Sequence, residues 1–560
     1  MRVLQLDVDK IRWKPIKPEA SVYEESKDSE VEAENAVVML ISIENGDTEE
    51  FAKKAVDESI DFAHKEKEQT LVIYPYAHLS DNLSSLNDAL NLLKAMRVEA
   101  AKSDLNILSA PFGWNKKLSL EIKGHPLAEE SHSYKSENKK NEPIAEKKHE
   151  LKIDVSLVQK SDWSGVPESD HRAIGEKQDL YSFQEVSPGM VYWHPKGYTI
   201  YRQLVGLMRS IEYKHDYEEI STPIITNIAL YQVSGHLQHY KDDMFMFDSS
   251  MGDVGLKPMN CPSTILIYKT HRWSYKDLPW RTAIFDKLHR SELSGVASGL
   301  FRVKELTQDD GHVFAREDQI KDEISDLLSM IKEVYGDIFK MKYSANLSTM
   351  PDNHMGDLEL WDKATAALKD ALDENHIKYN IKEKEGAFYG PKIDFDVFDS
   401  MGRSWQCATI QLDYQLPKNF KLEYTGSDGK QYTPVIIHRA ILGSIERFTA
   451  IMVEHYQGKF PLWLSPIQVR VLSISDQSND YAKKVYAKLK SAGIRSEIDI
   501  SDKTLEYKIR DGKLQQIPYL MILGKKEEEK GKVSVRSREG VQNNGIDLED
   551  FIKEVISAHP

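Results

Sequence analysis

The chain has 560 residues, of which 40% are hydrophobic and 29% are charged, and it carries a formal net charge of −15. This length exceeds what one hydrophobic core usually supports, and it predicts roughly three or four domains. The negative charge argues against a protein that coats nucleic acid without preference, because Lys and Arg supply that kind of affinity.

Two cysteines, Cys261 and Cys407, are too few for a disulfide framework. The first residues, MRVLQLDVDK, contain acids where a signal peptide needs an apolar stretch. The longest apolar runs, such as AVVMLISI at 36–43, are far shorter than the roughly 18 residues that a membrane helix needs. We therefore expect a cytoplasmic protein with no membrane span.

The segment 1–134 alternates strand-like and helical patterns, which predicts a compact α/β unit. The runs AVVMLISIE and TLVIYPYAHLS flank a helix predicted over 49–66. A second helix is predicted in NLSSLNDALNLLKAM, where one face would carry Leu83, Leu86, Leu90 and Leu93. Polar and charged sequence then predicts a solvated linker, placed over 135–180.

A large α+β domain is predicted over 181–463, where aromatic-rich strand-like runs alternate with turn signals such as SPGM and SDGK. The pattern then becomes regular: strand VRVLSI, helix YAKKVYAKLKSAG, and strands IRSEIDI and PYLMILG. Gly493 is expected to stop the helix. A small α/β domain is therefore predicted over 466–560, and the chain contains no internal repeat.

Cys261 lies in KPMNCPST, and taken alone it is more often a buried small hydrophobe than a metal ligand. No CxxC or HxxxH partner lies nearby. Three other stretches change this interpretation: FDKLHRSE at 285–292, FRVKELTQDDGH at 301–312 and IIHRAILGSIERF at 436–448. The first and third resemble the arginine-bearing motifs of class II aminoacyl-tRNA synthetases. With MNCP and QDDGH, the chain resembles the threonyl-tRNA synthetase family over nearly its whole length.

The resemblance implies a multidomain α/β and α+β protein. Its parts would be an N-terminal deacylase-like editing domain, a class II catalytic domain built on an antiparallel sheet, and a C-terminal α/β anticodon-binding domain. These parts correspond to the segments 1–134, 181–463 and 466–560.

The family binds one catalytic zinc ion per subunit through a cysteine and two histidines, which match Cys261, His312 and His438. Three protein ligands leave open positions on the metal, as catalytic zinc requires. The resemblance implies that the amine and hydroxyl of threonine fill them. Valine has threonine's shape but no hydroxyl, so such a site rejects it by roughly 10⁴-fold or more. The alternative for the histidines is a hydrogen-bonded core role, and Cys407 is assigned to packing.

Activation of an amino acid by ATP needs fixed positive charge at the phosphates, which arginine supplies. By resemblance, Arg290 clamps the α-phosphate and Arg447 holds the γ-phosphate. Glu292 is expected at the adenine amine, and Arg302 is a further ATP contact. Mg²⁺ is expected with ATP because of the phosphate charge. The chain departs from the class pattern at Leu306, where a phenylalanine normally lies under the adenine.

Further matches fill the predicted amino-acid pocket. Asp310 is expected at the threonine hydroxyl with Gln308 beside it, Tyr389 at the amine, and Lys392 near the reacting carboxylate. Asp310 follows another acid, and such a pair is more often a solvated turn, but the neighbouring zinc ligand favours a functional role. His236, in VSGH, matches a residue implicated in moving the threonyl group to the tRNA ribose as a proton acceptor, with a polar loop as the alternative.

Serine offers zinc the same two groups as threonine and lacks only a methyl, which is worth about 1–3 kcal/mol, so proofreading is needed. The segment 1–134 resembles the archaeal-type editing domain of this family, itself similar to D-aminoacyl-tRNA deacylases, through IYPYAHLS and APFGWNKKLSLEIKGHPLAEE. The matching residues are His78, Lys116 and Glu129. Asn115 stands where the family can carry a tyrosine. The alternative is an exposed lysine and a turn histidine.

The C-terminal segment resembles the family's anticodon-binding domain. Glu527 and Arg536, in GKKEEEKGKVSVR, match positions that contact anticodon bases. Acids can accept from base amino groups and arginines can donate, so both can read a base edge. Asp502 lies where some relatives carry a base-contacting asparagine, and by composition KKEEEKGK is a solvated turn.

The function implied is ATP-dependent activation of L-threonine, its transfer to tRNA(Thr), and hydrolysis of mischarged seryl-tRNA(Thr). A homodimer is expected, because the predicted helix 198–214 and the following YEEISTP resemble the dimer-forming motif of the class. Two alternatives stay open: another class II specificity, such as seryl or prolyl, and a non-catalytic tRNA-binding or regulatory paralogue. Such a paralogue should have lost a phosphate arginine or a zinc ligand, and this chain keeps all of them.

Overall fold

The structure is a computed structural model that describes residues 1–134 except 21, 27, 28, 81, 126 and 127, residue 163, and residues 165–292 and 299–558. The side chains of His78 and His239 also lie outside the described part. The chain forms two compact units, Met1–Leu151 and Lys152–Pro560. Among the helices within these described ranges, none has the length and apolar character needed to cross a membrane.

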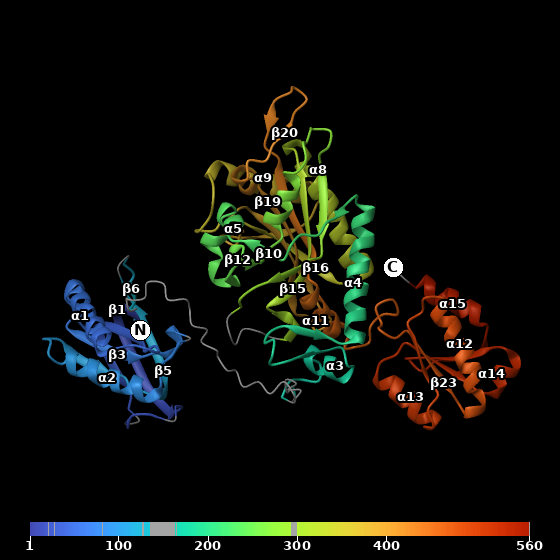
Figure 1. The fold of residues 1–560 in the computed structure, drawn as a ribbon, viewed down its shortest axis with the longest axis horizontal. Coiled ribbons are helices and arrows are strands. Elements are labelled where there is room, and N and C mark those ends of the chain that lie inside the picture. Colours follow the sequence, from blue (N-terminus) through green and yellow to red (C-terminus); the bar gives the residue numbers. More distant parts are fainter. Residues whose placement is uncertain are drawn as a thin grey trace. The chain divides into compact units, whose positions relative to one another are not determined.

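The first unit is a six-stranded sheet with two helices (Figure 1, blue). The strand order is β4-β3-β2-β1-β5, and β6 also pairs with β1. The helices pack on one apolar face of the sheet through residues such as Val56, Phe62, Leu93 and Met96. Its elements are β1 (Arg2–Pro18), β2 (Val31–Ser42), α1 (Glu49–Glu66), β3 (Thr70–Pro75), the 3₁₀ turn Ala77–Leu79, α2 (Leu86–Ala100), β4 (Asn106–Ser109), β5 (Trp114–Ile122) and β6 (Glu129–Ser133).

The predicted helix over 49–66 is confirmed, whereas the second predicted helix starts later than the leucine spacing suggested. α2 begins at Leu86 because Ser85 caps it, accepting a hydrogen bond from the backbone N–H of Asp88. Leu83 precedes the helix, forms an isolated bridge with Glu44 and is 47% exposed. The prediction that Leu83 shares the helical face is therefore wrong.

A nine-stranded, largely antiparallel sheet forms the centre of the second unit. Its order is β17-β16-β18-β19-β22-β15-β13-β9, with β14 also paired to β15. Only the β16–β17 and β13–β9 pairs are parallel. The strands are β9 (Glu218–Glu219), β13 (Trp280–Ile284), β14 (Lys287–His289), β15 (Glu305–Ala315), β16 (Lys342–Ser348), β17 (Tyr379–Lys382), β18 (Lys392–Phe398), β19 (Ser404–Asp413) and β22 (Val435–Ser444).

Long helices pack against this sheet and bury apolar side chains with it, among them Leu204, Leu327, Leu368 and Phe448. They are α4 (Pro195–Lys214), α8 (Ile320–Ile331), which continues as the π-helical turn Lys332–Ile338, α9 (Leu358–Glu374) and α11 (Ile445–Tyr456). Shorter elements are α3 (His171–Lys177), β7 (Tyr181–Phe183), β8 (Val191–Trp193), β10 (Ile225–Asn227), α5 (Ala229–Val233), α6 (His236–His239), β11 (Met246–Ser249), β12 (Gly252–Leu256), α7 (Cys261–Tyr268), α10 (Gln415–Asn419), β20 (Tyr424–Thr425) and β21 (Gln431–Tyr432). Four 3₁₀ turns complete the described part of this unit: Lys241–Asp243, Gly299–Phe301, Glu317–Gln319 and Asp476–Ser478.

The C-terminal part has a mixed five-stranded sheet in the order β24-β23-β25-β26-β27 (Figure 1, red). The predicted strands and the predicted helix are present, and Gly493 follows the helix at a positive φ of 77°. The elements are β23 (Val469–Ser473), α12 (Asn479–Ser491), β24 (Ser496–Asp499), α13 (Leu505–Leu514), β25 (Tyr519–Leu523), α14 (Lys525–Lys530), β26 (Val533–Ser537), β27 (Gln542–Ile546) and α15 (Leu548–Ser557).

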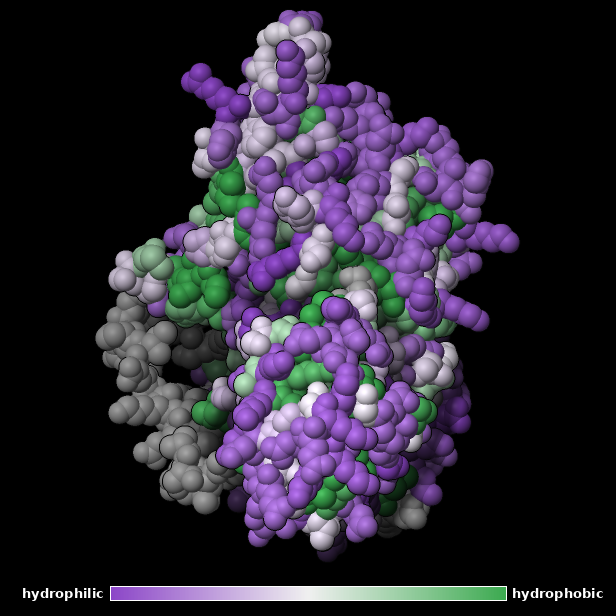
Figure 2. Space-filling model, turned by 90° about the vertical axis from the view of Figure 1, so that its right-hand side faces the viewer, coloured by the Kyte–Doolittle hydropathy of each residue, from purple (hydrophilic) through white to green (hydrophobic). Residues whose placement is uncertain are grey.

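Hydrophilic residues predominate on the face drawn in Figure 2, and hydrophobic residues lie there in separate groups. Such a surface is ordinary for a folded protein. The α/β units at both ends and the antiparallel central sheet agree with the predicted fold class.

Candidate active site and metal cluster

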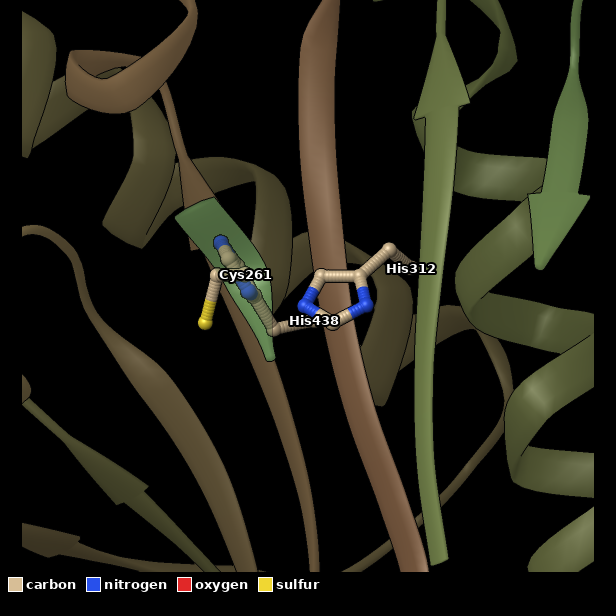
Figure 3. A group of neighbouring side chains, drawn as sticks. All are labelled: Cys261, His312 and His438. Carbon is tan, nitrogen blue, oxygen red and sulfur yellow. The ribbon is translucent and has the colours of Figure 1, made fainter. Parts of the chain in front are cut away.

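The three predicted zinc ligands come together at the centre of the antiparallel sheet (Figure 3). His312 on β15 and His438 on β22 are direct register partners, so their side chains lie on the same face. Cys261 is the first residue of α7. All three are buried, and one ligand atom from each lies within 4.8 Å of the others. The strand register therefore brings together residues that are 177 positions apart in the sequence, from Cys261 to His438.

The donor atoms of this cluster fit a metal ion. Both ring nitrogens of His312 and Nδ1 of His438 are buried with no hydrogen-bond partner among the described residues. Unpartnered buried polar atoms are costly, and a metal bond would satisfy them. Burial and the neighbouring His438 lower the pKa of His312 well below its usual range, which favours the neutral ring that binds metals.

Two other groups of metal-type side chains within the described ranges fit less well. In the first, Asp7, Glu66 and His125 lie together, but the Lys123 ammonium is 3.0 Å from Asp7 and supplies the positive charge. In the second, Nδ1 of His171 is 2.7 Å from Glu454, and Nε2 accepts from the backbone N–H of Leu300. Nε2 of His125 is likewise 3.0 Å from Asp7, so neither group has a buried histidine nitrogen without a partner in the described part of the chain.

Two residues of the predicted amino-acid pocket, Asp310 and Tyr389, lie beside the candidate metal cluster. Asp310 is 7% exposed, and its Oδ2 accepts a hydrogen bond of 3.0 Å from Nδ2 of the fully buried Asn260. Burial raises the pKa of Asp310 to about 6. The Tyr389 hydroxyl donates to the side chain of Gln411, and its ring lies 5.1 Å from that of His438. Asp310 and Tyr389 therefore lie next to the candidate metal ligands.

The other predicted pocket residues lie on strands of the same sheet. Gln308 is half-buried on β15, two residues before Asp310. Lys392 begins β18, opposite Gln411, and its Nζ is 2.7 Å from Asp394. This pairing holds the ammonium beside Asp394 on the same strand.

His236 is fully buried at the start of α6, so it does not belong to an exposed polar loop. Its Nδ1 is 2.8 Å from the Ser234 hydroxyl, and its Nε2 is 3.1 Å from the sulfur of Met259. Met259 lies two residues before Cys261. The ring is thus packed against the segment that carries Cys261.

The predicted phosphate and adenine residues form two groups. Arg302 and Glu292 are ion-paired at 2.6 Å. The backbone N–H of Arg447 donates to the side chain of Ser444, which caps α11. The Arg447 guanidinium lies 5.9 Å from the Trp405 ring. Its Nε is buried without a partner in the described part of the chain.

Stacked rings connect these two groups. Phe301, which precedes Arg302, stacks on Trp405 at 4.3 Å. Arg290 is half-buried, with its guanidinium 5.9 Å from the Tyr240 ring. Leu306 is 7% exposed and belongs to the core cluster. Residues 293–298, between the two arginine-bearing stretches, lie outside the described part.

The acid beside Asp310 belongs to a buried triad of ionisable side chains and not to a solvated turn. Arg439 is 1% exposed and lies 2.5 Å from both Asp309 and Glu212, with its guanidinium 4.6 Å from the Tyr217 ring. Asp309 also accepts from two backbone N–H groups of β22. Gly311 leaves room for this arginine, because a Cβ there would approach its Nε to 2.4 Å. The triad ties α4 to the two strands that carry the histidines.

A cavity of about 410 Å³ in the first unit contains part of the predicted editing set. Lys116 and Asn115 line it with Tyr74, Ala77 and other mostly apolar residues. Lys116 Nζ donates to the carbonyls of Pro111 and Trp114 at 3.0 and 3.2 Å. Burial lowers the pKa of Lys116 to about 8. Lys116 is therefore not the exposed lysine of the alternative interpretation.

The other two editing residues are placed differently. His78 lies in the turn Ala77–Leu79 next to the cavity, but its side chain is outside the described part. Glu129 is exposed on β6 opposite Leu6, whereas Lys116 lies opposite Pro15. Leu6 and Pro15 are nine positions apart on β1, which is roughly 30 Å of strand. The fold of one chain does not bring Glu129 to Lys116.

In the C-terminal part, both carboxylate oxygens of Glu527 are hydrogen-bonded within the domain. One accepts from the backbone N–H of Gly524 at 3.0 Å, which caps α14, and the other accepts from the Ser534 hydroxyl at 2.8 Å. Arg536 is half-buried on β26, and its Nε has no partner within the described residues. Asp502 is exposed. Of the two predicted base contacts, Glu527 is bonded within its own domain, whereas Arg536 keeps an N–H group without a partner among the described residues.

Known families match the three parts of the chain. Residues 1–134 match the "Archaea-specific editing domain of threonyl-tRNA synthetase", 245–456 the "tRNA synthetase class II core domain (G, H, P, S and T)", and 468–558 the "Anticodon binding domain". The "Threonine--tRNA ligase catalytic subunit" of Sulfurisphaera tokodaii is 49% identical over 73% of this chain and 76% of its own length.

The chain belongs to the threonyl-tRNA synthetase family.

A second relative in this family, the "Threonine--tRNA ligase" of Carboxydothermus hydrogenoformans, is 48% identical over 69% of this chain. The match spans 61% of that relative's length. A crystal structure described as the RNA binding domain of threonyl-tRNA synthetase from Cryptosporidium parvum superposes with a TM-score of 0.68. It shares 41% identity over 70% of this chain and 98% of that one.

Proposed function

We propose that the protein activates L-threonine with ATP, transfers it to tRNA(Thr), and hydrolyses mischarged seryl-tRNA(Thr). The observation that carries this proposal is the buried cluster of Cys261, His312 and His438 beside Asp310 in a class II core. Family membership supports the reaction, and the cluster supports the choice of amino acid.

Cys261, His312 and His438 would hold one Zn²⁺ per subunit, leaving positions open for a substrate. When bound, zinc supplies a Lewis acid contact for the amine and hydroxyl of threonine. Asp310, held by Asn260, would accept a hydrogen bond from the threonine hydroxyl. The Tyr389 hydroxyl, oriented by Gln411, would lie toward the amine. Valine leaves the hydroxyl contacts unpaired and is rejected.

The arginines bind and orient ATP in this proposal. Arg290 holds the α-phosphate at which the threonine carboxylate attacks, while Arg447 and Arg302 bind the outer phosphates with Mg²⁺. Lys392 lies near the reacting carboxylate, and Glu292 accepts from the adenine amine. The carboxylate oxygen bonds to the α-phosphorus, the bond to the β-phosphate oxygen breaks, and pyrophosphate leaves. The product is the aminoacyl-adenylate, a mixed anhydride.

Transfer to tRNA needs a proton acceptor for the ribose hydroxyl, and His236 is the candidate. Ser234 orients its Nδ1, which leaves Nε2 on the side of Met259 and the Cys261 segment. The ribose oxygen attacks the acyl carbon, and AMP leaves.

Editing is assigned to the cavity around Lys116. Water attacks the ester carbonyl of seryl-tRNA, and the Lys116 ammonium stabilises the oxyanion. The ester bond then breaks, and the ribose oxygen leaves with a proton. His78 is a proposed member of this site. The strand register separates Glu129 from Lys116 within one chain. Glu129 would therefore belong to this site only if a second chain supplied it.

Three further features belong to the proposal. The C-terminal part would bind the anticodon, with Arg536 as the base contact and Glu527 as a second predicted contact. A homodimer would form through α4 and the segment that follows it, including Pro223. The low cysteine content supports a cytoplasmic location.

ATP–pyrophosphate exchange with a panel of amino acids tests the proposal. We expect strong exchange with threonine, weaker exchange with serine, and none above background with valine or proline. Strong exchange with serine or proline but not threonine would favour another class II specificity. No exchange with any amino acid, together with retained tRNA binding, would favour a non-catalytic paralogue.

A further inference from the structure

Asp413 is a buried carboxylate on β19 that links a loop to the metal cluster. Its side chain is 0% exposed. Its Oδ2 lies 2.9 Å from Nε2 of His438. Its Oδ1 accepts hydrogen bonds from the backbone N–H groups of Gln415 and Leu416, at 2.7 and 3.0 Å. Both oxygens therefore have defined and different partners.

These contacts decide where the imidazole proton of His438 lies. A carboxylate oxygen only accepts, so Nε2 must carry the proton that it donates to Asp413. The neutral ring then has its lone pair on Nδ1, which has no hydrogen-bond partner among the described residues. That lone pair is the one available to the cluster with Cys261 and His312. The tautomer of the ligand thus depends on a residue that does not touch the metal position.

We propose that Asp413 is the positioning residue that fixes His438 in its Nε2–H tautomer and so sets the zinc affinity of the cluster. The inference rests on the zinc site of the proposed function. It assigns Asp413 a role distinct from packing, because the role depends on which atoms donate and which accept.

The substitution Asp413→Asn separates the two roles because asparagine has the same shape. The two backbone N–H groups at Gln415 and Leu416 only donate, so they hold the amide oxygen of asparagine at the Oδ1 position. The NH₂ group must then face His438 and donate to Nε2. Nε2 becomes the acceptor, the proton moves to Nδ1, and the metal-binding lone pair is lost.

Asp413→Ala removes the acceptor without supplying a donor, so His438 stays free to adopt either tautomer. The proposal therefore predicts that Asn lowers zinc affinity more than Ala does. A packing role predicts the opposite order, because Ala leaves a cavity and Asn does not. Asp399→Asn is the control, since Asp399 is also buried and also accepts from two backbone N–H groups, those of Met401 and Arg403. Its other oxygen accepts from the Arg403 guanidinium and the Trp405 indole, and not from a histidine.

The experiment is competition of the full-length protein against a chelator for Zn²⁺, with folding checked by circular dichroism. We expect Asp413→Asn to lose about 10–100-fold in zinc affinity. Asp413→Ala should lose less, and Asp399→Asn should match the wild type. Equal zinc affinity of Asp413→Asn and the wild type, or a greater loss in Ala than in Asn, would overturn the inference.

A second measurement needs no variant at Asp413 and decides the matter if neither variant folds. In the zinc-loaded wild-type protein with ¹⁵N-labelled histidine, assigned by comparison with His438→Gln, the inference predicts Nε2 of His438 protonated and Nδ1 bound to the metal. The reverse arrangement would overturn it while leaving the zinc site intact. A wild-type protein that binds no zinc would overturn both this inference and the metal assignment of the proposed function.

Discussion

Replacement of Glu212 by glutamine tests the buried triad that joins α4 to the active-site strands. One guanidinium, that of Arg439, faces two carboxylates, those of Glu212 and Asp309. The single positive charge of Arg439 can balance only one of the two carboxylates. Asp309 accepts two additional backbone hydrogen bonds, so Glu212 is the group expected to retain a proton.

The magnitude follows from the pKa. Burial raises the pKa of Glu212 from 4.5 to about 8. Between these values the unfolded chain loses the proton that the folded chain keeps, so the free energy of unfolding falls as pH rises. A shift of this size corresponds to roughly 5 kcal/mol, fully present below pH 4.5 and lost by about pH 8. Glutamine keeps the shape and an acceptor for Arg439 but has no proton to lose.

The assay is urea denaturation of wild type and Glu212→Gln from pH 5 to pH 8, following the transition of the catalytic part by tryptophan fluorescence. The variant should gain stability relative to the wild type as pH rises, by several kcal/mol over the range. Glu219→Gln, in the exposed ion pair with Arg209, should stay within about 0.5 kcal/mol of the wild type. A stability difference for Glu212→Gln that does not change with pH would refute the reasoning.

Three further predictions concern the proposed activities. Lys116→Met should abolish hydrolysis of seryl-tRNA without affecting threonine activation, and deacylation by the variant at the wild-type rate would contradict this role. In the wild type, enzymatic deacylation should decline above about pH 8, where the lysine loses its charge. Arg290→Lys should lower kcat/KM for pyrophosphate exchange by roughly 10²–10³-fold, because one ammonium cannot replace the guanidinium fork, and unchanged kinetics would exclude a phosphate contact. Leu306→Phe should lower the KM for ATP by about 2–10-fold, because the ring would stack on the adenine, and it should cost about 1–3 kcal/mol of stability because the site is buried. An unchanged KM would show that the adenine lies elsewhere.

The sequence was most informative where chemistry demands particular residue types. Cys261, His312 and His438 could be predicted because few side chains bind zinc and their motifs match a family. Asp413 was missed, since a buried acid that orients a histidine has no local signature. Its role becomes visible only when β19 pairs with β22.

Tertiary pairing also explains the other differences. Asp309, part of an apparent polar pair, is buried because Arg439 and Glu212 arrive from distant segments. The distance between Lys116 and Glu129 is set by the register of β1 with β5 and β6, which the spacing of thirteen residues does not reveal. Glu527 likewise accepts one of its two hydrogen bonds from Ser534 of the next strand.

The most direct test of the central claim is the exchange rate with threonine against valine, measured on protein of known zinc content together with Cys261→Ser. The account predicts about one zinc per subunit, a threonine-to-valine ratio in kcat/KM of roughly 10⁴ or more, and loss of both zinc and threonine activation in the variant. Two results would contradict it. One is zinc-free protein that activates threonine normally, and the other is a threonine-to-valine ratio below roughly 200-fold, which a pocket without the polar contact can reach.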